Sequence, residues 1–357
     1  MKSHVLERYL LRELAAAWAA VILVLLAIMM STRFARLLAD AATGEIPKDV
    51  LFQVLSLSAL QYGVILLPIS QLLAVMLTLG RLYKDNEIAA MTGCGVSLMR
   101  LCGPFFGFGA LLAAGSAFMA LEASPWAGRT VEYIVKDARR LVQYMPFEPG
   151  RFKEVASGRA VFYTGEMDAR DGRLAAIFAW VEEDGGPSLM IAREGHQRVN
   201  LETGDREVSL NDGWRYHGTP GVEHYDVMQF GRLDMRVTPP KLLSTGSKRS
   251  STPTSQLFAS PDLADRAELQ SRLSIPISIL LLTVLAVPLA HVRPRAGRYG
   301  KLVIGIVVYI VYANLLTIGR SWINQGTVAP ALGLWWVHAI ALIAGVALLA
   351  RRQGWLR

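Results

Sequence analysis

Apolar residues form three long runs near each end of the chain, and a long polar stretch separates the two sets. The runs are Leu14–Met30, Val50–Leu79, Leu98–Leu121, Leu273–Ala290, Leu302–Ile318 and Leu332–Ala350. A bilayer core about 30 Å thick needs about 20 helical residues, and lipid cannot hydrogen-bond free backbone groups. A soluble protein would not normally contain six such runs. The pattern therefore predicts six transmembrane helices, grouped at residues 14–122 and 266–357.

Two of the flanking patterns add detail to this picture. In residues 1–13 the apolar side chains share one helical face while Arg8 and Arg12 lie off it, which predicts a short helix in the headgroup layer. The second run contains Pro68 and several polar residues that lipid alone would not favour. They are Gln53, Ser56, Ser58, Gln61, Ser70 and Gln71. We expect them to face other helices or a wet cavity.

The polar stretch at residues 123–238 shows the alternation of β-structure. Short strands are predicted at Ala160–Thr164, Ala175–Val181, Ser188–Arg193, Gln197–Leu201, Glu207–Leu210, Trp214–His217 and Tyr225–Phe230. Turn residues such as Asp171-Gly172 and Asn211-Asp212-Gly213 separate them. This spacing favours a sandwich or jelly roll. Residues 239–265 are rich in Ser, Thr and Pro and are expected to form a linker.

Charge distribution predicts the orientation. With the N-terminus inside, the cytoplasmic flanks hold thirteen Lys and Arg residues, whereas the short outer loops hold Arg33, Arg36, Lys48 and Arg320. Both termini should be cytoplasmic, and the insert should lie on the other side. From Ala123 to Asp262 there are 18 basic and 19 acidic residues, so the net charge of +8 belongs to the membrane flanks and gives little support to nucleic-acid binding.

Motifs for catalysis are missing from the sequence. There is no phosphate-binding loop of the nucleotide hydrolases, no nucleophile elbow, and no carboxylate pair inside a span. Of the six histidines, His217 and His224 are the pair that a hairpin could bring together, although surface histidines are the simpler interpretation. Cys94 and Cys102 are the two cysteines and are expected to be structural thiols. The sequence predicts a non-catalytic chain that binds no metal or cofactor.

The connection between the second and third runs contains a candidate docking element at residues 84–92. Asp85 or Asn86 can cap a short helix, and Gly93 and Gly95 can end it. Such a helix, carrying the carboxylate of Glu87, either docks a cytoplasmic partner or simply connects two spans. Its residues alone leave both interpretations open.

Several segments, in order, resemble one family. They are Leu67-Pro68 followed by residues 81–95, then residues 266–276, Val287-Pro288-Leu289, and residues 293–298. Together with the order of three spans, an insert and three spans, they are similar to the lipopolysaccharide export permeases of the LptF/LptG (YjgP/YjgQ) family. Arg8-Tyr9-Leu10 and the run from Glu87 to Gly95 look more like the F subunit than the G subunit.

The resemblance implies a fold and a mechanism. The fold is an α-helical protein of the bacterial inner membrane, with six transmembrane helices and an inserted all-β, jelly-roll-like periplasmic domain. The mechanism pairs the chain with an LptG-like permease subunit on a cytoplasmic LptB-like ATPase dimer, which uses the ATP. Lipopolysaccharide is extracted into a cavity lined by spans one and five, and passes through the periplasmic domains, with an LptC-like bitopic protein, to an LptA-like bridge. Glu87, Ile88 and Met91 would couple the chain to the ATPase.

Three arginines lie where topology disfavours positive charge. Arg33 and Arg36 sit at the outer end of the first span and Arg320 at the outer end of the fifth. Arginine suits bidentate contact with phosphate, so these residues are candidates to bind the phosphates of lipopolysaccharide. Arg36 and Arg320 match cationic positions of the family; Arg33 is proposed from its position alone. Snorkelling to headgroups is the alternative for each of them.

Other classes of membrane protein fit less well. Another ABC exporter of lipids or lipoproteins is the nearest alternative, but the common lipoprotein-releasing type has its soluble domain after the first span. A receptor or scaffold with a β-rich outer domain would need no coupling helix. A membrane-embedded transferase would need an acidic metal site or a base that the sequence lacks.

Overall fold

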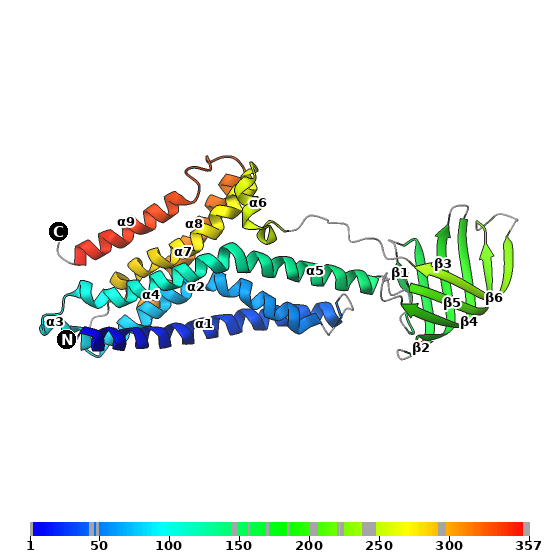
Figure 1. The fold of residues 1–357 in the computed structure, drawn as a ribbon, viewed down its shortest axis with the longest axis horizontal. Helices are drawn as coiled ribbons and strands as arrows, with labels where there is room; N and C mark the ends of the chain where they lie inside the picture. The colour runs from blue at the N-terminus through cyan, green and yellow to red at the C-terminus, as the bar shows by residue number, and fades with distance from the viewer. Residues whose placement is uncertain are drawn as a thin grey trace. The chain divides into compact units, whose positions relative to one another are not determined.

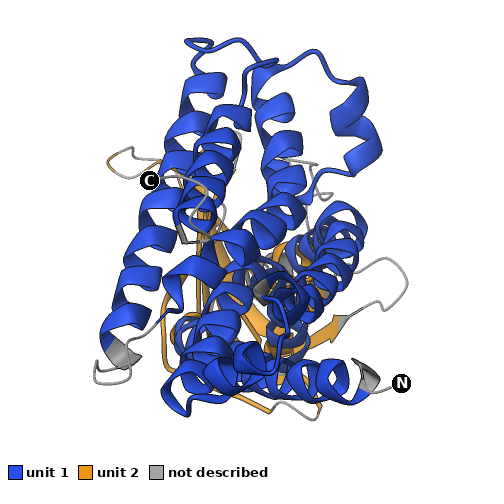
Figure 2. Ribbon diagram, turned by 90° about the vertical axis from the view of Figure 1, so that its left-hand side faces the viewer, with its two compact units in different colours: residues 1–36, 52–133, 246–357 blue, residues 37–51, 134–245 orange. Residues whose placement is uncertain are grey.

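The computed structural model describes residues 3–42, 46–47, 50–143, 149–155, 158–168, 171–183, 186–199, 206–219, 221, 225–237, 248–291 and 298–352. The chain forms two compact units, coloured separately in Figure 2. One unit comprises Met1–Arg36, Phe52–Tyr133 and Gly246–Arg357 and is helical. The other comprises Leu37–Leu51 and Ile134–Thr245 and contains the β-sheet.

Long apolar helices make up the first unit (Figure 1). Among the described residues, five helices are long and apolar enough to cross a membrane. They are α1 (Ser3–Ala42), α2 (Leu51–Lys84), α4 (Leu98–Phe118) with its continuation, α7 (Leu263–Leu289) and α8 (Arg298–Asn324). The sixth predicted span forms an apolar helix, α9 (Trp335–Arg352), that is shorter than the length the others reach.

The N-terminal helix and the second span are both simpler than the sequence suggested. α1 runs without interruption from Ser3 to Ala42, so the expected headgroup helix at 1–13 is the first part of one long helix. Pro68 lies inside a continuous α2. Ser58, Ser70 and Gln71 are buried, and Gln71 donates a hydrogen bond to the Thr283 hydroxyl of α7 at 3.3 Å. For Gln71 the prediction that these polar groups face other helices or a wet cavity is confirmed; Ser70 donates to the Leu67 carbonyl of its own helix.

The third span extends further than its apolar residues indicated. α4 continues through a π-helical turn, η2 (Met119–Ala123), into the polar helix α5 (Ser124–Gln143). Residues 123–143, which the sequence assigned to the β-domain, are therefore helical. The physical reason is that a helix already begun adds residues at little cost, and α5 places Ala127 and Val131 on one buried face.

The described residues just before α7 contain two short helices. Residues 239–247 of the expected linker lie outside the described residues. The rest contains a short 3₁₀ helix, η3 (Arg249–Ser251), and the helix α6 (Thr254–Ala259). The Asp262 side chain then caps α7 by accepting a hydrogen bond from the Ala264 amide. A Ser- and Thr-rich composition therefore reflects local hydrogen bonding here, not a loose tether.

The spans differ in how far the rest of the chain covers them. In α2 and α7, 67% and 50% of the apolar window is buried. In α1 and α8 only 6% and 17% is buried. α2 and α7 thus form the centre of the helical unit, with side chains such as Leu72, Leu79, Leu282 and Ala286 in its core. α1 and α8 leave most of their apolar surface uncovered.

The second unit contains a six-stranded antiparallel sheet in the described residues. Its strands are β1 (Lys153–Val155), β2 (Ala160–Met167), β3 (Arg173–Glu183), β4 (Gly186–Val199), β5 (Arg206–His217) and β6 (Asp226–Val237). Each strand pairs with the next one along the chain, so the order is β1-β2-β3-β4-β5-β6. A six-stranded sheet in the insert is confirmed, although the helix α5 precedes it. Its strand order is that of a meander.

One residue in each of β2 to β6 stands outside the described pairing, at the same level of the sheet. These residues are Gly165, Ala176, Arg193, Asp212 and Gly231, and we call them the fold line. Ala176 and Asp212 have φ values of 53° and 51°, in the left-handed region that L-residues rarely adopt. Pairing resumes on both sides, which explains why Asn211-Asp212-Gly213, expected as a turn, lies inside β5. Gln197–Val199, the described part of the strand expected at Gln197–Leu201, likewise lies inside β4; residues 200–201 lie outside the described residues.

The fold line lets a single sheet enclose its own core. In β3 the buried side chains are Leu174 on one side of Ala176, and Ile177 and Ala179 on the other, so the buried face changes parity. Because side chains alternate between faces in a strand, both halves now point into the same space. One cluster contains residues from both halves: Ala160, Phe162, Leu174, Ile177, Ala179, Met190, Ala192, Val208, Leu210 and Phe230. The strand halves on the two sides of the fold line thus share one core.

Candidate functional sites on the helical unit

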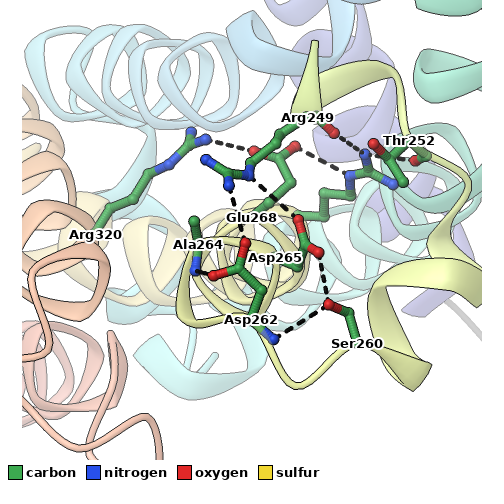
Figure 3. Close-up of polar contacts among 9 residues, drawn as sticks. Arg249, Thr252, Ser260, Asp262, Ala264, Asp265, Glu268 and Arg320 are labelled. Atoms are coloured by element: carbon green, nitrogen blue, oxygen red, sulfur yellow. Dashed lines mark hydrogen bonds and ion pairs between the residues drawn. The ribbon is translucent and has the colours of Figure 1, made fainter. Parts of the chain in front are cut away.

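A buried carboxylate near the start of α7 joins two arginines (Figure 3). Glu268 Oε1 lies 3.2 Å from Arg272 Nε, and Glu268 Oε2 lies 2.5 Å from Arg320 Nη2 of α8. The side chains of Glu268 and Arg272 are 7% and 5% exposed, whereas that of Arg320 is 40% exposed. Arg320 thus meets an acidic partner from its own chain, which the sequence analysis did not anticipate.

Arg272 holds the chain that leads into α7. Its Nη1 donates to the Thr254 hydroxyl at 2.8 Å. Its Nη2 donates to the backbone carbonyls of Arg249, Ser250 and Thr252, at 3.2, 3.1 and 2.9 Å. With Nε on Glu268, every nitrogen of this guanidinium has an acceptor. The multiple bonds satisfy a charge that would otherwise be costly to bury.

A second group of charges is separate from the first. Arg249 pairs with Asp262 at 2.9 Å and with Asp265 at 3.3 Å, and Asp265 accepts a hydrogen bond from the Ser260 hydroxyl (Figure 3). Each of these carboxylates therefore has its own donors. Glu268 remains the acidic partner of Arg320 in the described contacts.

Arg320 also lines a pocket of about 300 Å³ between α2, α7 and α8. Hydroxyl groups contribute much of its polar wall: Ser271, Ser274, Ser278, Tyr309, Tyr312 and Thr317. Apolar residues such as Ile65 and Leu316 form the rest. A cation beside hydroxyls and apolar side chains suits a ligand that carries an anionic group and an apolar body.

Hydrogen bonds fix one wall of this pocket. The Tyr312 hydroxyl lies 2.7 Å from Ser278 Oγ and 2.8 Å from His338 Nδ1, and His338 Nε2 lies 3.0 Å from Ser274 Oγ. These residues come from α7, α8 and α9 and are buried. They tie the three helices together within the apolar region, where interhelical hydrogen bonds are a common means of association.

Arg33 and Arg36 lie on α1, three residues apart and therefore on one face. Arg36 is exposed and Arg33 is half-buried, with a buried Nε that has no hydrogen-bond partner in the described part of the chain. No described contact joins either residue to Arg320. The structure therefore presents the predicted cations as two groups on the two least-covered spans.

The short helix predicted at residues 84–92 forms as α3 (Glu87–Gly93). Asn86 occupies its N-cap position with a φ of 59° and makes no side-chain cap, so the residue serves the turn through its left-handed backbone. Gly95, with a φ of 83°, follows the helix end. Ile88 is buried and Met91 is half-buried in the chain's own core, while Ala89 and Ala90 are exposed.

The carboxylate of Glu87 is linked to the start of α1. Tyr9 donates its hydroxyl hydrogen to Glu87 Oε2 at 2.9 Å, and Arg81 Nη2 donates to the same Tyr9 oxygen at 3.0 Å. Arg81 Nη1 also lies 3.0 Å from Glu13. This chain of contacts connects α3 to both α1 and α2. Glu87, the residue predicted to face a partner, is thus also held by Tyr9.

No group of three or more His, Cys, Asp and Glu side chains suitable for a metal occurs in the described residues. His217 Nδ1 lies 3.3 Å from the Ser188 hydroxyl, and His224, its suggested partner, lies outside those residues. Cys94 is exposed and Cys102 is buried, and neither forms a disulfide bond.

Sequence reasoning missed Glu268 and Arg272 as functional candidates. The signal was available, because two opposite charges four residues apart precede a long apolar run. Ionisable residues at such positions need partners and deserve a functional hypothesis. What the sequence lacked was the third member, since Arg320 is 52 residues away.

Comparison with known proteins covers almost the entire chain. The model of the family "Lipopolysaccharide export system permease LptF/LptG" matches residues 8–351. The lipopolysaccharide export system permease protein LptF of Escherichia coli strain K12 is 25% identical over 346 residues, which cover 96% of this chain and 94% of that protein. The protein of the same name from Shigella flexneri gives the same values. The chain therefore belongs to the lipopolysaccharide export permease family LptF/LptG.

Proposed function

We propose that this chain is an LptF-type permease subunit of an ABC transporter that extracts lipopolysaccharide from the inner membrane and passes it on for export. The observation that carries the proposal is that the spans with the most uncovered apolar surface, here called the open spans, also carry the candidate arginines. α1 and α8 are the described spans least covered by the rest of the chain, and they carry Arg33, Arg36 and Arg320. Spans one and five are the ones that line the substrate cavity in the family resemblance.

The exposed apolar surface of the chain leaves room for the partners that the family resemblance implies. Apolar side chains such as Val24 and Ile28 of α1 and Val307 of α8 are more than half exposed. Large apolar surfaces of this kind mark lipid or protein contacts. An LptG-like subunit facing α1 and α8 closes the cavity, an LptB-like ATPase dimer docks on α3, and LptC-like and LptA-like proteins receive the lipid from the sheet.

The chemistry assigned to this chain is binding and not catalysis. Arginine side chains at the outer ends of α1 and α8 hold phosphate groups of the lipid through charge-assisted hydrogen bonds. The partner ATPase uses the ATP, and this chain binds no cofactor. Both termini and α3 lie in the cytoplasm and the sheet lies in the periplasm, as the distribution of Lys and Arg favours.

Replacement of Arg36 by Glu tests the substrate role. In the reconstituted complex, Arg36→Glu should lower the ATPase activity stimulated by lipopolysaccharide, because a carboxylate repels the lipid phosphates. The basal ATPase activity should stay unchanged. Arg351→Glu, at an exposed position of α9, makes the same change of charge away from the proposed site. Stimulation of the Arg36 variant at the wild-type level would contradict the assignment.

A further inference from the structure

Glu268 has two arginine partners, and they are not equivalent. Arg272 is almost fully buried and donates to the carboxylate, to a hydroxyl and to three backbone carbonyls. Arg320 is 40% exposed, and in the described part of the chain its polar partner is Glu268. Arg272 is therefore fixed in place, while Arg320 has donors to spare and stands at the edge of the pocket.

The charges of this trio allow one partner to leave. Removing the single partner of a buried ion leaves an uncompensated charge, which is strongly unfavourable. Glu268 avoids that state, because Oε1 stays on Arg272 when Oε2 is released. Within the trio, one carboxylate and two guanidiniums sum to one positive unit, so Glu268 does not neutralise both arginines.

The neighbouring carboxylates do not provide a substitute. Asp262 and Asp265 are paired with Arg249, and Asp265 also accepts from Ser260 (Figure 3). Glu268 is the carboxylate that holds Arg320 in the described contacts. In this arrangement the Glu268–Arg272 contact is fixed, and the Glu268–Arg320 contact is the one that can open.

We propose that Glu268 is a positioning residue that holds Arg320 at the pocket when no lipid is bound and yields it to a lipid phosphate when the substrate arrives. The inference rests on the proposed function, since it assumes that Arg320 contacts the substrate. Glu268 competes with the phosphate for the same guanidinium. The competition weakens binding and thereby allows the lipid to be released again, which a transporter requires.

The test measures the affinity of the reconstituted complex for fluorescent lipid A that carries both phosphates, with the dephosphorylated lipid as reference. Glu268→Gln keeps the shape and an acceptor for Arg272 but removes the competing charge. It should bind the phosphorylated lipid about two- to five-fold more tightly, in the range expected for losing one partly exposed ion-pair competitor. Affinity for the dephosphorylated lipid should not change.

Two further variants make the result specific. Asp265→Asn makes the same change of charge one turn earlier on α7, on a carboxylate paired with Arg249, and should leave the affinity at the wild-type value. In the background of Arg320→Gln, the Glu268→Gln substitution should have no further effect, since the competition acts through Arg320. If Glu268→Gln does not assemble, Glu268→Asp withdraws the carboxylate by one methylene and should also tighten binding.

The outcomes separate the inference from the function beneath it. Unchanged or weaker binding by both Glu268 variants, while Arg320→Gln weakens binding, overturns the role of Glu268 alone. Equal tightening with and without Arg320 also overturns it, because Glu268 would then act by another route. If Arg320→Gln binds lipid A like the wild type, the assignment of Arg320 as a substrate contact fails, and the inference fails with it.

Discussion

At the scale of single residues, Glu87 illustrates how one side chain can have two partners. Its carboxylate accepts the Tyr9 hydroxyl, and Tyr9 in turn accepts from Arg81. These groups are partly exposed, so each contact contributes modestly to stability. The same contacts connect α3, the element proposed to dock on the ATPase, with α1, a span proposed to line the cavity. The contact between Glu87 and Tyr9 therefore links the proposed docking helix directly to a span that is proposed to line the cavity.

Glu87→Ala should reduce the amount of ATPase that co-purifies with the permease, because it removes the carboxylate proposed to face that partner. Tyr9→Phe removes the internal hydrogen bonds but leaves the carboxylate, and should retain the ATPase. Quantified pull-downs from the same membranes measure both. If the Glu87 variant yields as much complex as the wild type, α3 is a plain connection between two spans.

At the scale of elements, the fold line decides the shape of the sheet. In a flat meander of long strands, the apolar side chains on the two sides of the fold line, such as Leu174 and Ile177, would lie on opposite faces of the sheet. Neither face would then have a complete core. The left-handed residues Ala176 and Asp212 change the parity of β3 and β5, and Gly213, next to Asp212, lies close to its neighbours in the adjacent strands β4 and β6. A Cβ added at Gly213 would lie 2.5 Å from both the Ile191 carbonyl oxygen and the Phe230 ring.

Gly213→Ala should therefore destabilise the sheet by about 1–3 kcal/mol, the usual cost of overpacking a closed site. Gly231 lies on the same fold line, and an added Cβ there meets nothing within 4 Å. Gly231→Ala should leave stability almost unchanged. Hydrogen exchange of the β4 to β6 amides in the full chain measures the difference. Similar protection in the two variants would mean that close packing at Gly213 is not required.

At the scale of the whole molecule, the spans of the helical unit differ in how far their neighbours cover them. α2 and α7 are mostly covered by neighbours, whereas α1 and α8 are not. Lipid tails can cover apolar helices, so exposure alone does not identify a partner. The arginines on the same two helices are where an anionic substrate would bind under the proposed function, and contact with lipid headgroups is the alternative.

Cysteines placed on the open spans should cross-link to a second permease subunit. Val24 and Val311 are 54% and 53% exposed, and in a background without Cys94 and Cys102 each substitution to Cys, labelled with a maleimide photocross-linker, should form a covalent heterodimer on illumination. Ala74→Cys, at a position with 0% exposure, serves as the control. Cross-linking of Ala74→Cys but not of the open positions would contradict the proposed interface.

The sequence by itself determined the order of the parts. Long apolar runs have few alternatives to helices in lipid, and alternating residues with turn signals specify strands. The segments that resemble a known family lie along most of the chain and led to the family. Arg36 and Arg320 were selected because topology disfavours positive charge at the expected outer ends of spans, and Glu87 because it lies in a short connecting helix that resembles the family's coupling segment.

The tertiary structure decided what those charges contact. Glu268 and Arg272 stand four residues apart in a sequence that does not reveal Arg320 as their neighbour, since that contact spans 52 residues. Likewise Asn211-Asp212-Gly213 has the composition of a turn, but the pairing of β5 with both neighbours keeps it inside a strand. Local composition sets the preferences of a segment, and the contacts made across the chain determine which preference is realised.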